Sequence, residues 1–297
     1  RANLLAIYRD KPKQWDAWNI DNGYQSSRRF LRAGKANVED GALIVPFEIE
    51  GDSLARMRIS LLDGEPFLRV DVDVDWEVRH RLLRVENWVP LNVASVTYGT
   101  PHGTIARSFA NDTPELRAKY EVPGQRFALV SEPGKDGFAI LALDTYGWSA
   151  RALREGGIQL GHSLLRSPAW PDPDADRGTH RISYAFAPVE SSSVGTVERA
   201  WQQFAHDPRV KLFINNDRAL LVTACKPAED GDGVIVRVRE CDGVSRIAAM
   251  RCAARITSVE SVDALERSLS DARVEIAGES LQFDIGAFGL RSFRVRF

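Results

Sequence analysis

Hydrophobic and polar side chains alternate along much of the chain. The clearest case is the stretch 68–76, in which every second position is apolar and most positions between are charged. Because successive side chains of a strand point to opposite faces, this pattern predicts an antiparallel strand with one face against a core. Similar strands are predicted over 181–186, 234–240 and 291–297. Asp-Gly and Pro-Gly pairs separate them at intervals typical of sandwiches, so we expect an all-β protein.

One segment departs from this period. Its apolar residues recur at the spacing of a helical face. They are Val197, Ala200, Trp201 and Phe204. We predict a connecting helix over 196–207, with Thr196 as its N-cap and Pro208 beyond its end.

This helix would separate two β units of unequal size. The larger is expected over 1–195 and the smaller over 208–297. A second short helix is predicted over 261–269, inside a loop of the smaller unit. Neither unit contains an internal repeat or a low-complexity tract.

The charges nearly balance, since 39 Lys and Arg residues against 41 Asp and Glu residues give a net charge of -2. The arginines are scattered along predicted strands and form no basic block, which argues against nucleic acid or an anionic membrane as a partner. No apolar run approaches the roughly 18 residues of a membrane span, and the start lacks the layout of a signal peptide. We therefore expect a soluble protein with a neutral ligand. Because a strand is already under way at Leu4, we expect a piece of a longer polypeptide.

Three cysteines, Cys225, Cys241 and Cys252, are widely spaced and form no C-x-x-C pair. This spacing favours neither a disulfide framework nor a thiolate zinc site. We expect small buried apolar side chains, which suits a reducing cytoplasm.

Acidic residues suggest a metal site in two places, and neither has the required pattern. Asp71, Asp73 and Asp75 lie on the solvent face of one predicted strand. The run at Asp172, Asp174 and Asp176 begins like a calcium loop. However, Arg177 stands where such a loop needs Gly, and Ser183 stands where it needs Glu. The five histidines form neither H-E-x-x-H nor H-x-D, so we expect no metal or other cofactor in this chain.

Aromatic residues in turn-rich segments are more informative. Trp15 and Trp18 flank Asp16, Asp21 follows, and Trp170 lies in another loop-like stretch. Sugar sites combine a flat aromatic ring with carboxylate, Asn or Arg partners, so these loops favour carbohydrate binding. Packing in the core is the alternative for each tryptophan. A serine nucleophile elbow and a glycine-rich phosphate loop are both absent.

Two of these segments carry a family resemblance. Residues 8–21, Y-R-D-K-P-K-Q-W-D-A-W-N-I-D, resemble the D-x-P-x-x-W-D-A-W-D-I-D signature of family-38 α-mannosidases. The stretch 164–186, which contains R-S-P-A-W-P-D-P, is also similar to that family. So are the turns V-S-E-P and D-T-Y-G-W, and 221–240 looks like the family's last β domain. The resemblance covers essentially the whole chain, although Asn19 replaces the usual acidic residue.

The resemblance implies a galactose-mutarotase-like β supersandwich, without its opening strands, followed by a small β sandwich. Such a chain would be the non-catalytic C-terminal part of a retaining exo-α-mannosidase that hydrolyses terminal α-mannosides in glycan catabolism. Zinc and the aspartate nucleophile would lie in a separate N-terminal catalytic barrel. That barrel and α-mannoside glycans would be the partners. Residues at the carbohydrate rim or the interdomain surface would be Asp16, Trp18, Asp21 and Arg166.

Two alternatives remain open. An autonomous aldose epimerase would share the expected fold and use a His and a Glu as acid and base. A free-standing carbohydrate-binding module would use the aromatic loops alone. Under the mannosidase interpretation we expect the isolated chain to be inactive, the whole protein to be cytoplasmic, and the large sheets to favour a homo-oligomer.

Overall fold

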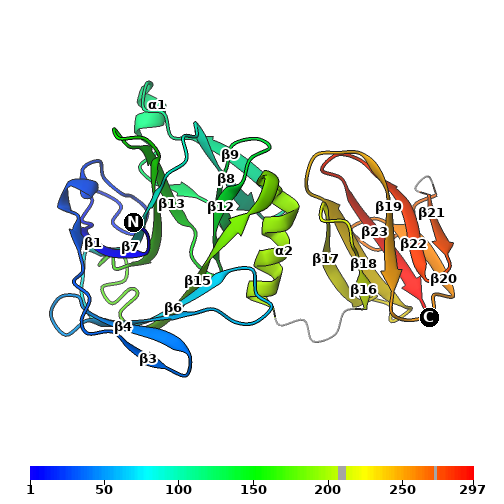
Figure 1. The fold of residues 1–297 in the computed structure, drawn as a ribbon, viewed down its shortest axis with the longest axis horizontal. Coiled ribbons are helices and arrows are strands. Elements are labelled where there is room, and N and C mark those ends of the chain that lie inside the picture. The colour runs from blue at the N-terminus through cyan, green and yellow to red at the C-terminus, as the bar shows by residue number, and fades with distance from the viewer. Residues whose placement is uncertain (207–211, 271–272) are drawn as a thin grey trace. The chain divides into compact units, whose positions relative to one another are not determined.

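The computed structural model describes residues 1–206, 212–270 and 273–297. It divides into two compact units, Arg1–Ser192 and Ser193–Phe297, each built from two sheets (Figure 1). Neighbouring strands run antiparallel, so the predicted all-β class is confirmed. The likeness to galactose mutarotase stays a prediction. Within the described ranges, every helix is too short or too polar to cross a membrane.

The first unit contains a six-stranded and a nine-stranded sheet. The smaller sheet has the order β10 (Val122–Pro123), β13 (Gly147–Ala152), β14 (Ile158–Arg166), β7 (Arg81–Val89), β1 (Leu4–Arg9) and β2 (Arg29–Phe30). The larger sheet has the order β3 (Asn37–Glu39), β4 (Ala42–Glu48), β5 (Leu54–Ser60), β6 (Leu68–Trp76), β15 (Gly178–Val189), β12 (Gly137–Ala142), β11 (Gln125–Val130), β8 (Ser95–Thr100) and β9 (Gly103–Ser108). Three short helical segments complete it: η1 (Tyr24–Ser27), α1 (Pro114–Arg117) and η2 (Glu190–Ser192).

The inner faces of these two sheets share one apolar core. Alternate residues of β6 are buried, and the fully enclosed indole of Trp76 ends that row. On the outer face of the same strand, the Asp73 carboxylate accepts hydrogen bonds from Arg181 of β15 and lies opposite Arg56 of β5. The alternation at 68–76 therefore has the predicted consequence: apolar burial on one face and charge pairing on the other.

A histidine is enclosed in this core. The imidazole of His162 stacks on the indole of Trp148 with ring centroids 4.0 Å apart, and its Nε2 lies 2.7 Å from the hydroxyl of Thr145. Burial, together with the nearby Arg84 charge, lowers the pKa of His162 to about 3. The ring is therefore neutral and acts as part of the core.

The second unit contains two four-stranded sheets and one helix. The first sheet has the order β16 (Phe213–Ile214), β19 (Arg246–Cys252), β22 (Ser280–Ile285) and β21 (Val274–Ala277). The second has the order β17 (Leu220–Pro227), β18 (Val234–Glu240), β23 (Leu290–Arg296) and β20 (Ser258–Val262). The helix is α2 (Val194–Ala205).

The start of α2 differs from the prediction. Its N-cap is Ser193, whose hydroxyl accepts a hydrogen bond from the backbone N–H of Thr196 at 3.2 Å, so Thr196 lies inside the helix. The serine-rich run offered several capping side chains, and the apolar periodicity that located the helix begins only in its second turn. Residue 207 and Pro208, where the helix was predicted to end, lie outside the described residues.

The helix predicted over 261–269 is wrong. Strand β20 continues to Val262, and the carboxylate of Asp263 then accepts hydrogen bonds from the backbone N–H groups of Leu265 at 2.8 Å and Arg267 at 3.0 Å. A short acidic side chain that binds nearby N–H groups in this way favours a turn over a helix.

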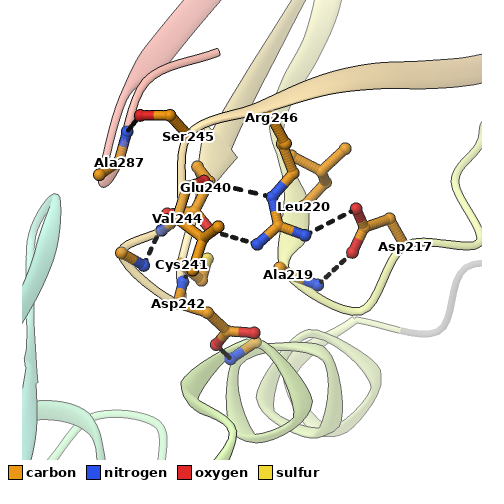
Figure 2. A network of polar contacts seen from close by, with 12 residues as sticks. Asp217, Ala219, Leu220, Glu240, Cys241, Asp242, Val244, Ser245, Arg246 and Ala287 are labelled. Carbon is orange, nitrogen blue, oxygen red and sulfur yellow. Dashed lines mark hydrogen bonds and ion pairs between the residues drawn. The ribbon is translucent and has the colours of Figure 1, made fainter.

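A buried carboxylate organises the turn after β18 in the second unit. The side chain of Glu240 accepts hydrogen bonds from four backbone N–H groups and from the guanidinium of Arg246, which also contacts Asp217 (Figure 2). The four donors are the N–H groups of Asp242, Gly243, Val244 and Phe288. Burial alone would raise the pKa of Glu240, but these N–H donors outweigh it and hold the pKa below its usual value.

The contact between α2 and the segment before β17 generates a first prediction. A Cβ on Gly195 would lie 2.1 Å from the carbonyl oxygen of Arg218. Alanine improves helix propensity by about 1 kcal/mol, but so close a contact with backbone costs about 2–3 kcal/mol. We expect Gly195→Ala to lower the free energy of unfolding by about 1–2 kcal/mol in urea titrations. Gly286→Ala is the control, because a Cβ at that residue would have no heavy atom within 4 Å; equal stability of the two variants would contradict the argument.

The buried His162 generates a second prediction. The unfolded chain takes up a proton near pH 6.5, whereas the folded chain does so only near pH 3. Stability is therefore fully present above pH 6.5 and falls as the pH drops below it, by about 2 kcal/mol between pH 7 and pH 5 from this residue alone. His162→Gln should remove this part of the pH dependence while lowering stability at pH 7. The exposed His102→Gln should retain the full pH dependence, and a His162→Gln profile parallel to the wild type would refute the assignment.

Candidate functional site

Three exposed tryptophans lie together at one end of the six-stranded sheet. Trp15, Trp18 and Trp170 are 62%, 67% and 53% exposed. Their ring centroids are 6.5 Å apart for Trp15 and Trp18, 6.4 Å for Trp15 and Trp170, and 5.4 Å for Trp18 and Trp170. We call these three residues the tryptophan cluster. Large exposed aromatic groups in contact with one another mark a binding surface more often than scattered exposed residues do.

The loop after β1 carries two of the three indoles. The carbonyl oxygen of Trp15 accepts hydrogen bonds from the backbone N–H groups of Trp18 at 2.9 Å and Asn19 at 2.8 Å. Trp15 itself adopts a left-handed conformation with φ of 60°, which is uncommon for a bulky residue. The carboxylate of Asp21 closes the loop by accepting from the backbone N–H of Lys13 at 2.9 Å. The loop is thus held by its own hydrogen bonds.

Arg166, the last residue of β14, fixes this loop to the sheet. Its guanidinium donates to the buried carboxylate of Asp10 and to the carbonyl oxygens of Asp16 at 2.9 Å and Ala17 at 3.1 Å. A further N–H donates to the carbonyl of Asn19. Since a guanidinium has five N–H donors, four of them are occupied by the loop. The fork of Arg166 therefore positions the tryptophan cluster.

Asp16 connects the two segments that carry the cluster. One oxygen of its carboxylate accepts a hydrogen bond from the backbone N–H of Ala169 at 2.7 Å, next to Trp170. The other oxygen lies 3.6 Å from Nδ1 of His80, a contact that is an ion pair only when His80 is protonated. Trp170 precedes a cis peptide bond to Pro171. Loop and strand end are therefore joined by both Asp16 and Arg166.

The middle aspartate of the acidic run after Trp170 is paired with two arginines. Asp174 accepts hydrogen bonds from Arg177 and Arg79, each at 2.8 Å, and these donors hold the pKa of Asp174 below its usual value. In the described part of the chain, no group of three or more His, Cys, Asp or Glu side chains could hold a metal ion.

The structure brings together all four residues predicted for the rim or the interdomain surface. Trp18 is exposed, the hydrogen bonds of Asp16 and Arg166 hold its loop, and Asp21 closes that loop. Whether these residues contact sugar or another domain stays a prediction. Sequence reasoning missed Asp10 and His80, because a carboxylate at a strand end and a lone histidine carry no local signal. Trp15 and Trp170 lie within the quoted motifs, so the sequence did contain a signal for both.

The four hydrogen bonds of Arg166, which we call the Arg166 clamp, generate a third prediction. Lysine cannot reach four acceptors at once, and Arg166→Lys would leave the buried Asp10 carboxylate poorly paired. We expect a loss of about 2–4 kcal/mol in unfolding free energy, with a change in tryptophan fluorescence of the native state. Arg181→Lys is the matched control, since its ion pair with Asp73 is largely exposed and is expected to cost under about 1 kcal/mol. A similarly small loss for both variants would rule out the clamp.

Comparison with known proteins places this chain in a family. Residues 1–174, more than half of the chain, match the family described as glycosyl hydrolases family 38 C-terminal domain. Residues 219–293 match the glycosyl hydrolases family 38 C-terminal beta sandwich domain. An α-mannosidase from Saccharomyces cerevisiae is 28% identical over 343 residues, which cover 100% of this chain and 31% of the yeast protein.

Other relatives agree. Mouse alpha-mannosidase 2C1 is 30% identical over 209 residues, covering 67% of this chain and 20% of the mouse protein. In fold, the chain is similar to the crystal structure of an α-mannosidase from Enterococcus faecalis V583, with a TM-score of 0.71 and 12% identity over 99% of this chain and 38% of that one. The chain thus spans less than half the length of the proteins it matches. It belongs to glycoside hydrolase family 38 and corresponds to the family's C-terminal region.

Proposed function

We propose that this chain is the non-catalytic C-terminal β portion of a retaining exo-α-mannosidase, which removes terminal α-mannose residues during glycan catabolism. The observation that carries the proposal is the tryptophan cluster: an exposed aromatic surface held rigidly by Arg166 and Asp16. The relatives' much greater length leaves room for a catalytic domain that would cover or adjoin this surface.

The cluster suits a surface that packs on a catalytic barrel and shapes the rim of its sugar site. Tryptophan supplies a large apolar area, and a loop fixed in advance loses little conformational entropy on association. Indole faces also stack on the C–H faces of sugar rings, so one cluster could serve both contacts. We place zinc and the nucleophile in the barrel, and the contribution of this chain is positioning.

A free-standing carbohydrate-binding module is the second candidate, favoured by the same exposed indoles. Titration of the isolated chain with mannose, followed by tryptophan fluorescence, separates the two: saturable binding by the chain alone would favour the module.

An aldose epimerase is less well supported. The buried carboxylate of Glu86 contacts Tyr8, Arg84 and Gln159. Among the described residues that line its cavity there is no histidine. The acid and base pair that epimerisation requires is therefore not assembled at this carboxylate.

We also propose a cytoplasmic location. Cys225, Cys241 and Cys252 are free thiols; Cys241 and Cys252 are buried, whereas Cys225 is exposed, so the prediction of a buried side chain is wrong for Cys225. Burial raises the pKa of Cys241 to about 11, which keeps this thiol protonated. Cysteines that form no disulfide suit a reducing compartment. Homo-oligomer formation stays a prediction.

The interdomain and rim roles generate a fourth prediction, for the full-length parent protein. Trp18→Ala combined with Trp170→Ala should lower kcat/KM for a terminal α-mannoside by about tenfold or more, since truncation of a central tryptophan at an interface costs above about 1–2 kcal/mol. A fall in the melting temperature as well indicates packing between domains, whereas a raised KM with unchanged melting temperature indicates the sugar rim.

Tyr146→Ala serves as the control, because Tyr146 is also an exposed aromatic residue but lies outside the cluster. Unchanged kcat/KM and unchanged melting temperature in the double tryptophan variant would refute the proposed role. Mutarotation of free aldoses by the isolated chain would instead support the epimerase.

A further inference from the structure

A second polar site lies on the outer face of the six-stranded sheet. There, β1, β7, β13, β14 and η1 surround a cavity of about 70 Å³. The residues that matter for its chemistry are Tyr8, Tyr24, Arg28, Glu86, Arg151 and Gln159. Four of the six are buried, whereas Arg28 is half-buried and Arg151 is exposed, so the cavity has arginines at its solvent side.

The hydrogen-bond acceptors of this cavity are already occupied. The carboxylate of Glu86 accepts from the hydroxyl of Tyr8 at 2.6 Å, from Nε of Arg84 at 3.2 Å and from Nε2 of Gln159 at 2.5 Å. The amide oxygen of Gln159 accepts from Arg28 at 3.2 Å and from Nε of Arg151 at 2.9 Å. A ligand that donates hydrogen bonds would find few free lone pairs here.

The donors, by contrast, are in excess. The hydroxyl of Tyr24 accepts from Arg84 at 3.1 Å and from Gln25 at 3.5 Å, and the hydroxyl of Ser149 accepts from Arg84 at 2.6 Å. Within the described residues, neither hydroxyl proton has an acceptor. Tyr24 and Ser149 both line the cavity, and their hydroxyl protons remain free to be donated to a ligand.

The balance of charges around the cavity also favours an anionic ligand. Arg84 is paired with Glu86 and Glu121, but in the described parts of the chain Arg28 and Arg151 form no ion pair. These two guanidiniums converge on the neutral amide oxygen of Gln159. Three guanidiniums against two carboxylates leave one net positive charge. Two cations that share one neutral acceptor favour an anion beside them.

We propose that this cavity binds the phosphate, sulfate or carboxylate group of an anionic ligand through Arg28, Arg151 and the hydroxyl of Tyr24. The volume decides between this and a neutral sugar: about 70 Å³ corresponds to roughly two waters at about 30 Å³ each, enough for one oxyanion but too small for a hexose ring. A sugar hydroxyl would also need an acceptor for its proton, and the acceptors of the cavity are already occupied. The site is separate from the tryptophan cluster and does not rest on the mannosidase role.

The test uses the 297-residue chain and sodium phosphate or sodium sulfate, with sodium chloride at equal ionic strength as the reference. We expect saturable heat of binding in calorimetry and a raised melting temperature for phosphate and sulfate over chloride. Arg28→Gln combined with Arg151→Gln should weaken phosphate affinity at least about tenfold, because two charge-assisted contacts are lost. Tyr24→Phe should weaken it by a smaller factor.

Arg154→Gln is the control, since Arg154 is exposed in the β13–β14 connection, three residues after Arg151, but does not line the cavity. This variant should bind phosphate as the wild type does. If the double variant does not fold, Arg151→Gln alone, at an exposed position, carries the test. Absence of saturable phosphate and sulfate binding, equal binding by the arginine variants, or an equal loss in Arg154→Gln would overturn the proposal. A hexose 6-phosphate that binds more tightly than inorganic phosphate identifies a ligand-borne group, and weaker binding identifies the free ion.

Discussion

The first unit depends on a guanidinium that has no access to water. The side chain of Arg84 is 1% exposed, and an unpaired charge at such a position would cost several kcal/mol. Glu86 and Glu121 supply the opposite charge, and the hydroxyls of Tyr24 and Ser149 accept further N–H groups. Burial lowers the pKa of Arg84, but the attraction of these neighbours outweighs it and raises the pKa above its ordinary value.

This network gives the six-stranded sheet two unlike faces. Its inner face contributes apolar side chains to the core shared with the nine-stranded sheet, whereas its outer face is polar and yet largely buried. Gly161 makes the arrangement possible, because a Cβ there would lie 2.2 Å from Nη2 of Arg84. The outer face can hold the charge of Arg84 because Glu86 and Glu121 pair with it and because the Glu86 carboxylate also accepts from Tyr8 and Gln159. The surplus of donors at its rim makes an anion the fitting ligand.

Arginine has a second use in the same unit. The guanidinium of Arg166 donates hydrogen bonds to backbone carbonyls of the loop after β1. These hydrogen bonds hold in place the loop that carries two of the three exposed tryptophans. Such a surface suits a lasting contact with another domain. The fold similarity to the Enterococcus protein at only 12% identity also has a physical basis: alternation and turn chemistry can be kept by many different residues.

The sequence by itself determined the all-β class, because period-two alternation such as that of 68–76 is a local property of the chain. It also located the helix near Val197, and its tryptophan-rich motifs pointed to the segments that form the cluster. Only the tertiary structure decided that Trp15, Trp18 and Trp170 touch, because Arg166 lies about 150 residues along the chain from the loop it clamps. The cavity beside Arg84 could not be predicted from the sequence either, because its residues come from four strands and a short helix. Their chemistry depends on which donors and acceptors remain unpaired after folding.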